Sequence, residues 1–278
     1  MKFSIYCIAF AIILACSGPN KGEEDNLAAL EITIDTVVID PGEEILFLTW
    51  KLGLSAISED KKFLYNFNNQ DFAIEQINLN TLKYEKKYPF EKEGPNGIGE
   101  YLMDFSLIKN DQLFFRTYSG EGIFDWQGNK LESFDLAVLG KEQKLLEETD
   151  RAYKLLSLSS EGEKFAALIT NYQSKTNTLA IIDRKLKTFK KHAIPAVEKA
   201  SNFEVFLNDG KTAFGLSSYR FLINEGNKII LGTSVSNELY VLNEESDSLQ
   251  LVSYQSELSP TQKTGTYPAE VSDMAEFR

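Results

Sequence analysis

The sequence is short of the side chains that most often carry chemistry, since its 278 residues include two Cys and one His. A Cys or His metal cage and a His-based triad both need more partners than this. Basic residues are also scarce, with 29 Lys and Arg against 41 Asp and Glu and a net charge of -12. A nucleic-acid binder needs a basic surface to replace counterions. The composition therefore predicts no nucleic-acid partner, no metal and no cofactor.

Long hydrophobic runs are missing as well. The single apolar stretch at the N-terminus covers residues 5–15 and follows Lys2. A membrane-spanning helix needs about 20 apolar residues, so this run is too short to be one. A positive residue followed by a short apolar run is typical of a secretory signal. The sequence predicts an exported protein whose residues 1–15 are a signal peptide.

The apolar run ends in Leu14, Ala15 and Cys16, with Ile13 before them. This order resembles the lipobox of bacterial lipoproteins, in which the Cys receives a diacylglycerol and becomes the acylated N-terminus. The resemblance implies lipidation of Cys16 and a membrane partner through that anchor; an ordinary signal peptide is the alternative. Loss of Lys2 leaves 28 basic against 41 acidic residues, a net charge of -13. Since Cys7 is removed and Cys16 carries lipid, we expect a thiol-free mature domain.

Residues 16–29 form a polar tether that contains Glu23, Glu24 and Asp25. This tract resembles the acidic stretch that marks surface-exported lipoproteins in Bacteroidota. The resemblance implies an outer-membrane lipoprotein exposed at the cell surface. The alternative is a solvated linker that its own charge extends away from the membrane.

From residue 30 to residue 278 the chain alternates short apolar runs with turns. β-branched and aromatic residues in such runs are typical of strands, and we expect strands at 32–39 and 44–50. A helical pattern is expected at 141–149, and a second helix near residue 268. Laid over one another, the runs give a repeat of strand, loop, strand, turn and strand, with four copies in residues 58–90, 110–136, 159–195 and 227–254.

Many of these runs are apolar at every position, as in Leu239 to Leu242. Such strands are covered on both faces, which happens when small antiparallel sheets stack on one another. Four-stranded sheets stacked radially make a β-propeller, so we predict an all-β fold of four-stranded antiparallel blades. A two-sheet sandwich is the alternative, but it does not explain a repeat of about 50 residues.

Several segments resemble an uncharacterised family of Bacteroidota lipoproteins that carry a domain of unknown function. They are Asp40 to Glu44 with Trp50, Leu64 to Asn68, Phe90 to Gly99, Leu258 to Thr261 with Lys263 to Gly265, and Tyr267 with Pro268. The resemblance covers residues 30–278 and implies a six-bladed propeller, but no activity and no catalytic residues. Family members continue beyond residue 278, so the resemblance implies a C-terminally incomplete or open ring.

The glycine-dense stretch Gly94 to Gly99 lacks the Gly-Lys-Ser/Thr ending of a phosphate-binding loop. We predict a crossing loop between blades that needs positive φ at glycine, with Asn96, Glu100 and Tyr101 as handles of a possible binding loop. His192 is expected at a strand edge. Most aromatic residues are expected to fill the spaces between blades. The sequence does not decide whether the side chains of Trp50 and Trp126 are exposed.

Together these features favour a non-enzymatic binding or interaction module with a protein, peptide or glycan partner. The alternative is a hydrolase or lyase that acts on an extracellular polymer at the mouth of the propeller channel. That alternative requires carboxylates with raised pKa, or His192, to converge at this mouth.

Overall fold

The computed structural model describes residues 33–277 except 50–51, 109–110, 119, 159–161, 172, 209–212 and 258. The chain divides into two units, residues 1–38 and 39–278. The predicted signal peptide, Cys16 and the tether lie outside the described residues. Within the described part, no helix is long and apolar enough to span a membrane.

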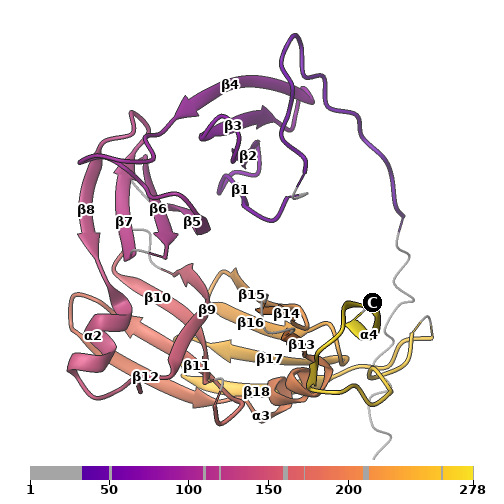
Figure 1. Ribbon diagram of the computed structural model, residues 1–278. Coiled ribbons are helices and arrows are strands. Elements are labelled where there is room, and N and C mark those ends of the chain that lie inside the picture. Colours follow the sequence, from indigo (N-terminus) through magenta and orange to yellow (C-terminus); the bar gives the residue numbers. More distant parts are fainter. Residues whose placement is uncertain are drawn as a thin grey trace, which may run out of the picture. The chain divides into compact units, whose positions relative to one another are not determined.

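The larger unit is built from four-stranded antiparallel sheets in which neighbouring strands are consecutive in the chain (Figure 1). Sheet 1 consists of β1 (Ser55–Ile57), β2 (Phe63–Asn68), β3 (Ala73–Asn78) and β4 (Lys83–Pro89). Sheet 2 consists of β5 (Leu102–Ile108), β6 (Gln112–Thr117), β7 (Gly120–Asp125) and β8 (Lys130–Phe134). Both follow the predicted repeat, with one additional strand at the start of each copy.

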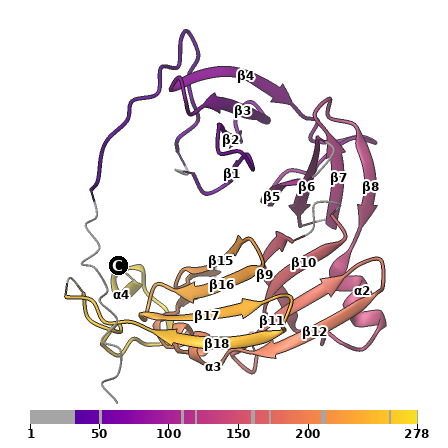
Figure 2. The ribbon, with the colours of Figure 1, turned by 180° about the vertical axis from the view of Figure 1, so that it is seen from behind.

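Two further sheets have the same order of strands, and Figure 2 shows them from behind. Sheet 3 consists of β9 (Asp150–Ser157), β10 (Lys164–Asn171), β11 (Thr176–Asp183) and β12 (Thr188–Ala193). Sheet 4 consists of β15 (Arg220–Glu225), β16 (Lys228–Thr233), β17 (Glu238–Asn243) and β18 (Ser248–Ser253). The prediction of an all-β fold with four-stranded antiparallel blades is confirmed.

A three-stranded sheet follows sheet 3 in the chain, and the sequence analysis did not predict it. β13 (Val205–Asn208) pairs antiparallel with β14 (Ala213–Leu216) and parallel with β19 (Glu270–Val271). Residues 209–212, between β13 and β14 in the chain, lie outside the described ones. Its strands are short, and β19 comes from a distant part of the chain, so no local repeat marks this sheet.

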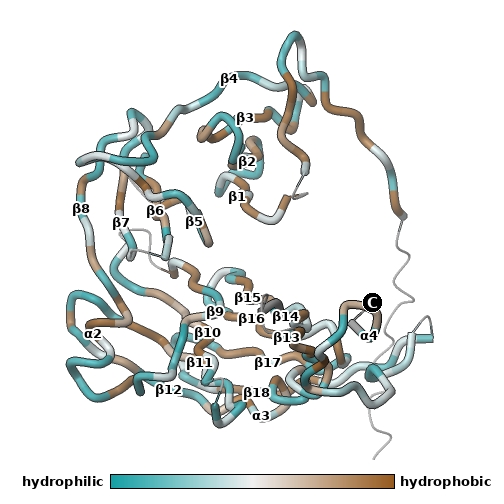
Figure 3. The backbone as a smooth tube through the Cα atoms, viewed as in Figure 1, coloured by the Kyte–Doolittle hydropathy of each residue, from teal (hydrophilic) through white to brown (hydrophobic). Residues whose placement is uncertain are grey.

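The middle strands of each sheet fill the spaces between sheets. In β6, Phe115 packs in the core between sheets 1 and 2, whereas the adjacent Phe114 packs in the core between sheets 2 and 3. In β10, Ala167 faces the second core and Leu168 faces a third, shared with sheet 4. The outer strands β4 and β12 are mainly hydrophilic (Figure 3). The prediction that apolar strands are covered on both faces is confirmed for β6 and β10, whereas in Leu239 to Leu242 of β17 only Tyr240 and Leu242 are buried.

The first strands of successive sheets are also in contact, β1 with β5, β5 with β9, and β9 with β15. The β5–β9 contact is reinforced by a buried ion cluster. The guanidinium of Arg116 donates to Asp104 Oδ2 from Nε at 2.7 Å, and to the carbonyl of Ala152 at 2.9 Å. Lys154 pairs with the same carboxylate. Removing one partner of such a buried cluster leaves an uncompensated charge, so these residues fix how the two sheets meet.

The third strand of every four-stranded sheet ends in a residue that caps the next turn. Asn78 Oδ1, for example, accepts hydrogen bonds from the backbone N–H of Asn80 and Thr81. Shortly after it, Leu82 adopts a left-handed φ of 54°. The four capping residues are Asn78, Asp125, Asp183 and Asn243. Short acids and amides mimic a backbone turn in this way, which explains why they recur at this position.

The second strands end in buried polar residues that hold the turn at the other end of each sheet. Asn68 and Asn171 each accept backbone hydrogen bonds from the residues two and three positions further along the chain. Thr233 accepts one from Val235, while the Thr117 hydroxyl donates to the carbonyl of Gly120. Each side chain satisfies a backbone group that would otherwise be left without a partner.

Two predicted strands are not strands in the structure. Residues 33–39 and 44–49 have no regular secondary structure. Asp40, directly after the first segment, forms an isolated bridge with Lys83 of β4. β-branched composition favours a strand only where a neighbouring strand can pair with it. Here the prediction was wrong because no described strand lies alongside either segment over its length.

The helix expected at 141–149 begins earlier, as α2 (Leu136–Glu142). The Asp135 carboxylate accepts from Val138 N at 2.8 Å and so fixes the start. Backbone N–H groups of Leu145 and Leu146 both donate to Gly140 O, which closes the helix before the predicted leucine pair. The remaining helices are α3 (Pro195–Glu198), the 3-10 helix η1 (Lys199–Phe203) and α4 (Met274–Phe277), the last within the region where a helix was expected.

The turn caps provide a stability test in a single loop. Replacing Asn78 with Ala removes its turn bonds and its 2.8 Å donation to Glu85 Oε1, so we expect the free energy of unfolding to fall by about 1 kcal/mol. Asn80→Ala in the same turn serves as the control, because only its backbone N–H is bound. Urea unfolding that gave both variants the same midpoint would contradict the capping role.

Candidate binding cleft on sheet 1

A carboxylate in the middle of sheet 1 is completely buried. Glu75 lies at the centre of β3, and its side chain is 0% exposed. Its oxygens accept hydrogen bonds from Asn66 Nδ2 at 3.0 Å and from Asn68 Nδ2 at 2.8 Å, both on β2. Burying a carboxylate is costly unless its oxygens are bonded, so these amides are required to hold it.

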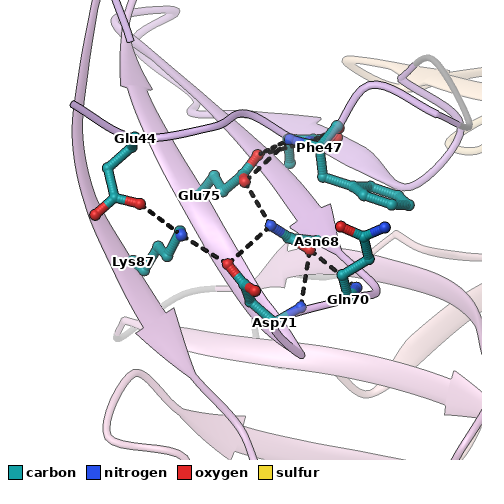
Figure 4. A network of polar contacts seen from close by, with 8 residues as sticks. Glu44, Phe47, Asn68, Gln70, Asp71, Glu75 and Lys87 are labelled. Atoms are coloured by element: carbon teal, nitrogen blue, oxygen red, sulfur yellow. Dashed lines mark hydrogen bonds and ion pairs between the residues drawn. The ribbon is translucent and has the colours of Figure 1, made fainter. Parts of the chain in front are cut away.

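Glu75 also reaches a segment that precedes the sheet in the chain. The backbone N–H of Phe47 donates to both carboxylate oxygens, at 3.2 and 3.3 Å. On the other side of the same residue, the Phe47 carbonyl accepts from Asn66 Nδ2 at 2.8 Å. Side chains of β2 and β3 therefore bind the backbone of Phe47 as a neighbouring strand would, and Figure 4 shows them converging on it.

A second set of contacts closes the same region toward β4. Lys87 Nζ lies between Glu44 Oε2 at 2.8 Å and Asp71 Oδ2 at 2.6 Å (Figure 4). These two hydrogen bonds raise the pKa of Lys87 above its ordinary value, because both stabilise the charged ammonium. Asp71 accepts in addition from Asn68 Nδ2 at 3.2 Å. Asn68 thus joins the buried Glu75 to the exposed ion pair.

These contacts border a cleft of about 410 Å³. One wall is the segment 43–49, and the opposite wall is formed by the turn after β2 and by β4. The cleft is polar and acidic, because Glu43, Glu44 and Asp71 face a single cation, Lys87. Ile45 adds an exposed apolar side chain to the lining. Leu48 of the same segment is exposed as well but does not line the cleft.

Three residues of the wall segment have backbone groups without a partner in the described part of the chain. Within the described residues, no hydrogen bond involves the peptide groups of Ile45, Leu46 or Leu48. Phe47 between them is held, as described above, by Glu75 and Asn66. A backbone that is fixed at one residue and unpaired around it can accept an added strand.

The sequence analysis missed Glu75. Its strand reads Ala73, Ile74, Glu75, Gln76 and Ile77, in a copy of the repeat whose strands were expected to be covered on both faces. A carboxylate in such a strand needs buried donors, and this was the signal that could have identified it.

The predicted binding-loop residues are not gathered into one site. Asn96 Oδ1 accepts from Lys130 N at 3.1 Å and so attaches the loop to β8. Glu100 is exposed, and Tyr101 is exposed beside Tyr118, with their rings edge to face at 6.3 Å. The crossing loop itself is confirmed, since it connects β4 with β5 and has φ of 90° at Gly94 and 92° at Gly99.

His192 lies on β12, the outer strand of sheet 3, and its side chain is 11% exposed. Its Nε2 is 3.3 Å from Asp247 Oδ1, and Lys190 pairs with the other oxygen of that carboxylate. Asp247 belongs to the turn before β18, so Lys190 connects sheet 3 with sheet 4 through this carboxylate. His192 therefore lies beside an ion pair at an outer strand.

The aromatic side chains mainly serve the cores, as predicted. Trp126 packs against Tyr65 at 4.9 Å and Tyr88 at 4.3 Å between ring centroids, partly buried at the core between sheets 1 and 2. Trp50 lies outside the described residues. No group of three or more acidic, His or Cys side chains in the described part of the chain could hold a metal ion.

The sequence of residues 26–278 matches the model of a domain of unknown function, DUF4221. The chain belongs to this family. A crystal structure of a DUF4221 member from Bacteroides vulgatus is similar, with a TM-score of 0.51 and 12% identity, over 77% of this chain and 60% of that one. The chain therefore spans about 60% of the length of that structure. The family resemblance drawn from the sequence is confirmed.

Less similar structures include propellers from unrelated proteins. The β-propeller domain of Myceliophthora thermophila Cps50 (Swd1) has a TM-score of 0.39 and 12% identity, over 73% of this chain and 56% of that one. An extracellular domain of the putative hybrid two-component system BT4673 from Bacteroides thetaiotaomicron has a TM-score of 0.41 and 14% identity, over 79% and 30%. No curated protein matches the sequence.

Replacing Glu75 tests whether it holds the cleft. Glu75→Gln keeps the shape but turns one acceptor into an NH₂ group, which faces the Phe47 N–H and the NH₂ group of either Asn66 or Asn68. We expect a loss of about 3 kcal/mol of unfolding free energy, because buried donors lose their acceptor. Glu85→Gln on β4 is the matched control, since Glu85 is exposed. Denaturant unfolding measures both, and equal stability of the two variants would contradict the role of Glu75.

A second buried carboxyl gives a pH dependence. Burial raises the pKa of Glu121 on β7 to about 7 from 4.5, although Leu136 N donates to it at 2.9 Å. The folded state then holds a proton that the unfolded state has lost between pH 4.5 and 7. Stability should fall by about 3 kcal/mol as the pH rises through this window, and stay level above it. Glu121→Gln should remove this slope in urea unfolding at pH 4.5 to 8, and an unchanged slope would contradict the assignment.

Proposed function

We propose that this chain is a lipoprotein of the cell envelope, anchored through Cys16, whose propeller domain binds an extended segment of a protein partner in the cleft on sheet 1. The export signal and the Cys that follows it support the location. The family has no assigned activity, so the proposal rests on the cleft itself. Its carrying observation is the wall segment, held at Phe47 and unpaired on both sides.

An extended peptide fits this wall because it supplies what Ile45, Leu46 and Leu48 lack. Addition of a strand satisfies backbone donors and acceptors without requiring a particular sequence. The exposed apolar side chain of Ile45 then contacts the peptide. Such binding needs little rearrangement, since Glu75 and Asn66 already fix the middle of the wall.

The charge of the cleft selects among peptides. Glu43, Glu44 and Asp71 outnumber Lys87, so a basic residue in the peptide gains attraction and an acidic one is repelled. The net charge of -12 on the whole chain acts in the same direction at long range. The preferred partner segment is therefore extended, partly apolar and basic.

The hydrolase or lyase alternative required His192 or carboxylates of raised pKa at one mouth of the propeller. His192 instead has Asp247 as its partner at an outer strand, and Glu121 bonds to the backbone of Leu136. Neither observation favours catalysis over binding.

The proposal is tested with immobilised octapeptides of alternating Val and Lys, and with the same peptides carrying Glu in place of Lys. We expect the full chain to bind the Lys peptides, and N-methylation of alternate peptide amides to abolish binding because the added strand loses its donors. Biolayer interferometry gives the dissociation constants.

The key variant is Glu43→Lys, since Glu43 lines the cleft and makes no described contact. It should weaken binding of the Lys peptides roughly tenfold, by removing one attraction and adding one repulsion. Glu225→Lys on sheet 4 has the same charge change at an exposed site and should leave binding within twofold. Equal binding of Lys and Glu peptides, or equal effects of the two variants, would overturn the proposal.

A further inference from the structure

A second cleft lies at one end of sheet 4 and has a different chemical character. One wall is the turn between β16 and β17, and the opposite wall is the loop 259–267. Backbone hydrogen bonds attach this loop to the turn, from Lys263 N to Val235 O at 2.7 Å and from Asn237 N to Thr261 O at 2.8 Å. The cleft measures about 550 Å³. Its two walls are therefore fixed relative to each other.

The lining combines aromatic faces with neutral hydrogen-bonding groups. Tyr254 is 50% exposed and Tyr267 is 44% exposed. Hydroxyls and amides come from the turn and the loop, and they include Ser236, Asn237 and Gln262. Among the residues that line this cleft there is no Asp or Glu. In a chain with 41 acidic residues, a cleft of this size without one is a distinct surface.

The only charged side chain in the lining is Lys263. Its Nζ lies over the rings of Tyr267 at 4.9 Å and Phe203 at 5.0 Å from the centroids. Within the described residues it makes no ion pair with a carboxylate. Cation–π contacts hold an ammonium in place but leave its charge uncompensated, so an anion in the cleft finds a positioned partner.

Gly265 allows the Tyr267 ring to lie close to the loop backbone. The φ of this residue is 113°, a conformation that L side chains rarely adopt, and an added Cβ would lie 3.2 Å from the Tyr267 ring. The loop therefore brings the ring close to its own backbone and beside Lys263.

We propose that this cleft binds an acidic oligosaccharide, one that carries carboxylate groups on its sugar rings. The apolar face of a pyranose packs on the exposed ring of Tyr254, and its hydroxyl groups exchange hydrogen bonds with Ser236, Asn237 and Gln262. Lys263, which lies over the Tyr267 ring, binds one carboxylate. This site lies on a different sheet from the peptide cleft and goes beyond the function proposed there.

The test uses the full chain and isothermal titration calorimetry with tetrasaccharides of galacturonic acid, and with galactose tetrasaccharides of the same linkage as neutral partners. We expect the uronate to bind at least tenfold more tightly than the neutral sugar at low salt. The difference should shrink as salt rises, because it depends on one charge pair.

Two variants separate the contributions of charge and ring. Lys263→Gln should reduce uronate binding roughly tenfold and leave neutral-sugar binding within twofold. Tyr254→Ala should weaken the binding of both tetrasaccharides, since the sugar rings of both stack on this tyrosine. Lys92→Gln is the matched control, because Lys92 also lies over a ring, that of Phe72 at 4.9 Å, but belongs to the loop after β4.

The results are read together with thermal unfolding of every variant, so that loss of fold is recognised. Absence of uronate binding by the folded chain, equal binding of uronate and neutral sugar, or the same loss in Lys263→Gln and Lys92→Gln would each overturn the proposal. Failure here leaves the peptide proposal intact, because Glu43→Lys and the octapeptides report on the other cleft only.

Discussion

Neighbouring four-stranded sheets bury apolar faces against one another, and the rest of the structure depends on this constraint. Adjacent residues of a strand point to opposite faces, so a single strand supplies two cores at once. Phe114 and Phe115 of β6, and Ala167 and Leu168 of β10, are pairs of this kind. Every core between sheets is thus shared, and a sheet without its neighbours would expose one apolar face.

The first strands meet the same constraint with charge as well as with apolar side chains. Asp104, Arg116 and Lys154 form one buried cluster between β5, β6 and β9. Arg220 of β15 is buried too, with Glu204 at 2.6 Å and the Tyr153 ring of β9 at 5.2 Å. Ion pairs cost more to bury than apolar residues and need defined geometry. They therefore specify how neighbouring sheets meet, whereas the aromatic cores supply most of the burial.

The repeat, the all-β class and the coverage of both faces could be predicted, because all three depend on local composition and on the order of apolar runs. What could not be predicted depends on partners that are distant in the chain. The segments at 33–39 and 44–49 have the composition of strands but no described strand to pair with. β19 pairs with β13, from which it is distant in the chain. The loop with Asn96, Glu100 and Tyr101 was selected for its glycines, yet the acidic cleft arises from Glu75, a residue that only the fold brings to Phe47.

Both clefts lie at the end of a sheet where the second strand stops, and the residue at this position differs between the two sheets. In sheets 1 and 3 it is an Asn, long enough to reach beyond its own turn. Asn171 binds Glu147, Thr149 and Asp150, at and just before the start of β9, and Asn68 helps Glu75 to hold Phe47 before β1.

In sheet 4 the residue is Thr233, whose hydroxyl accepts from Val235 N, and the second cleft opens beside it. The segment before β15 is bonded by the next residue of the turn instead, since Ser234 N donates to Tyr219 O at 2.9 Å. The core constraint fixes the middle of every sheet, and variation is tolerated at this end. Binding surfaces of different charge can therefore form there without any change in the packing between sheets.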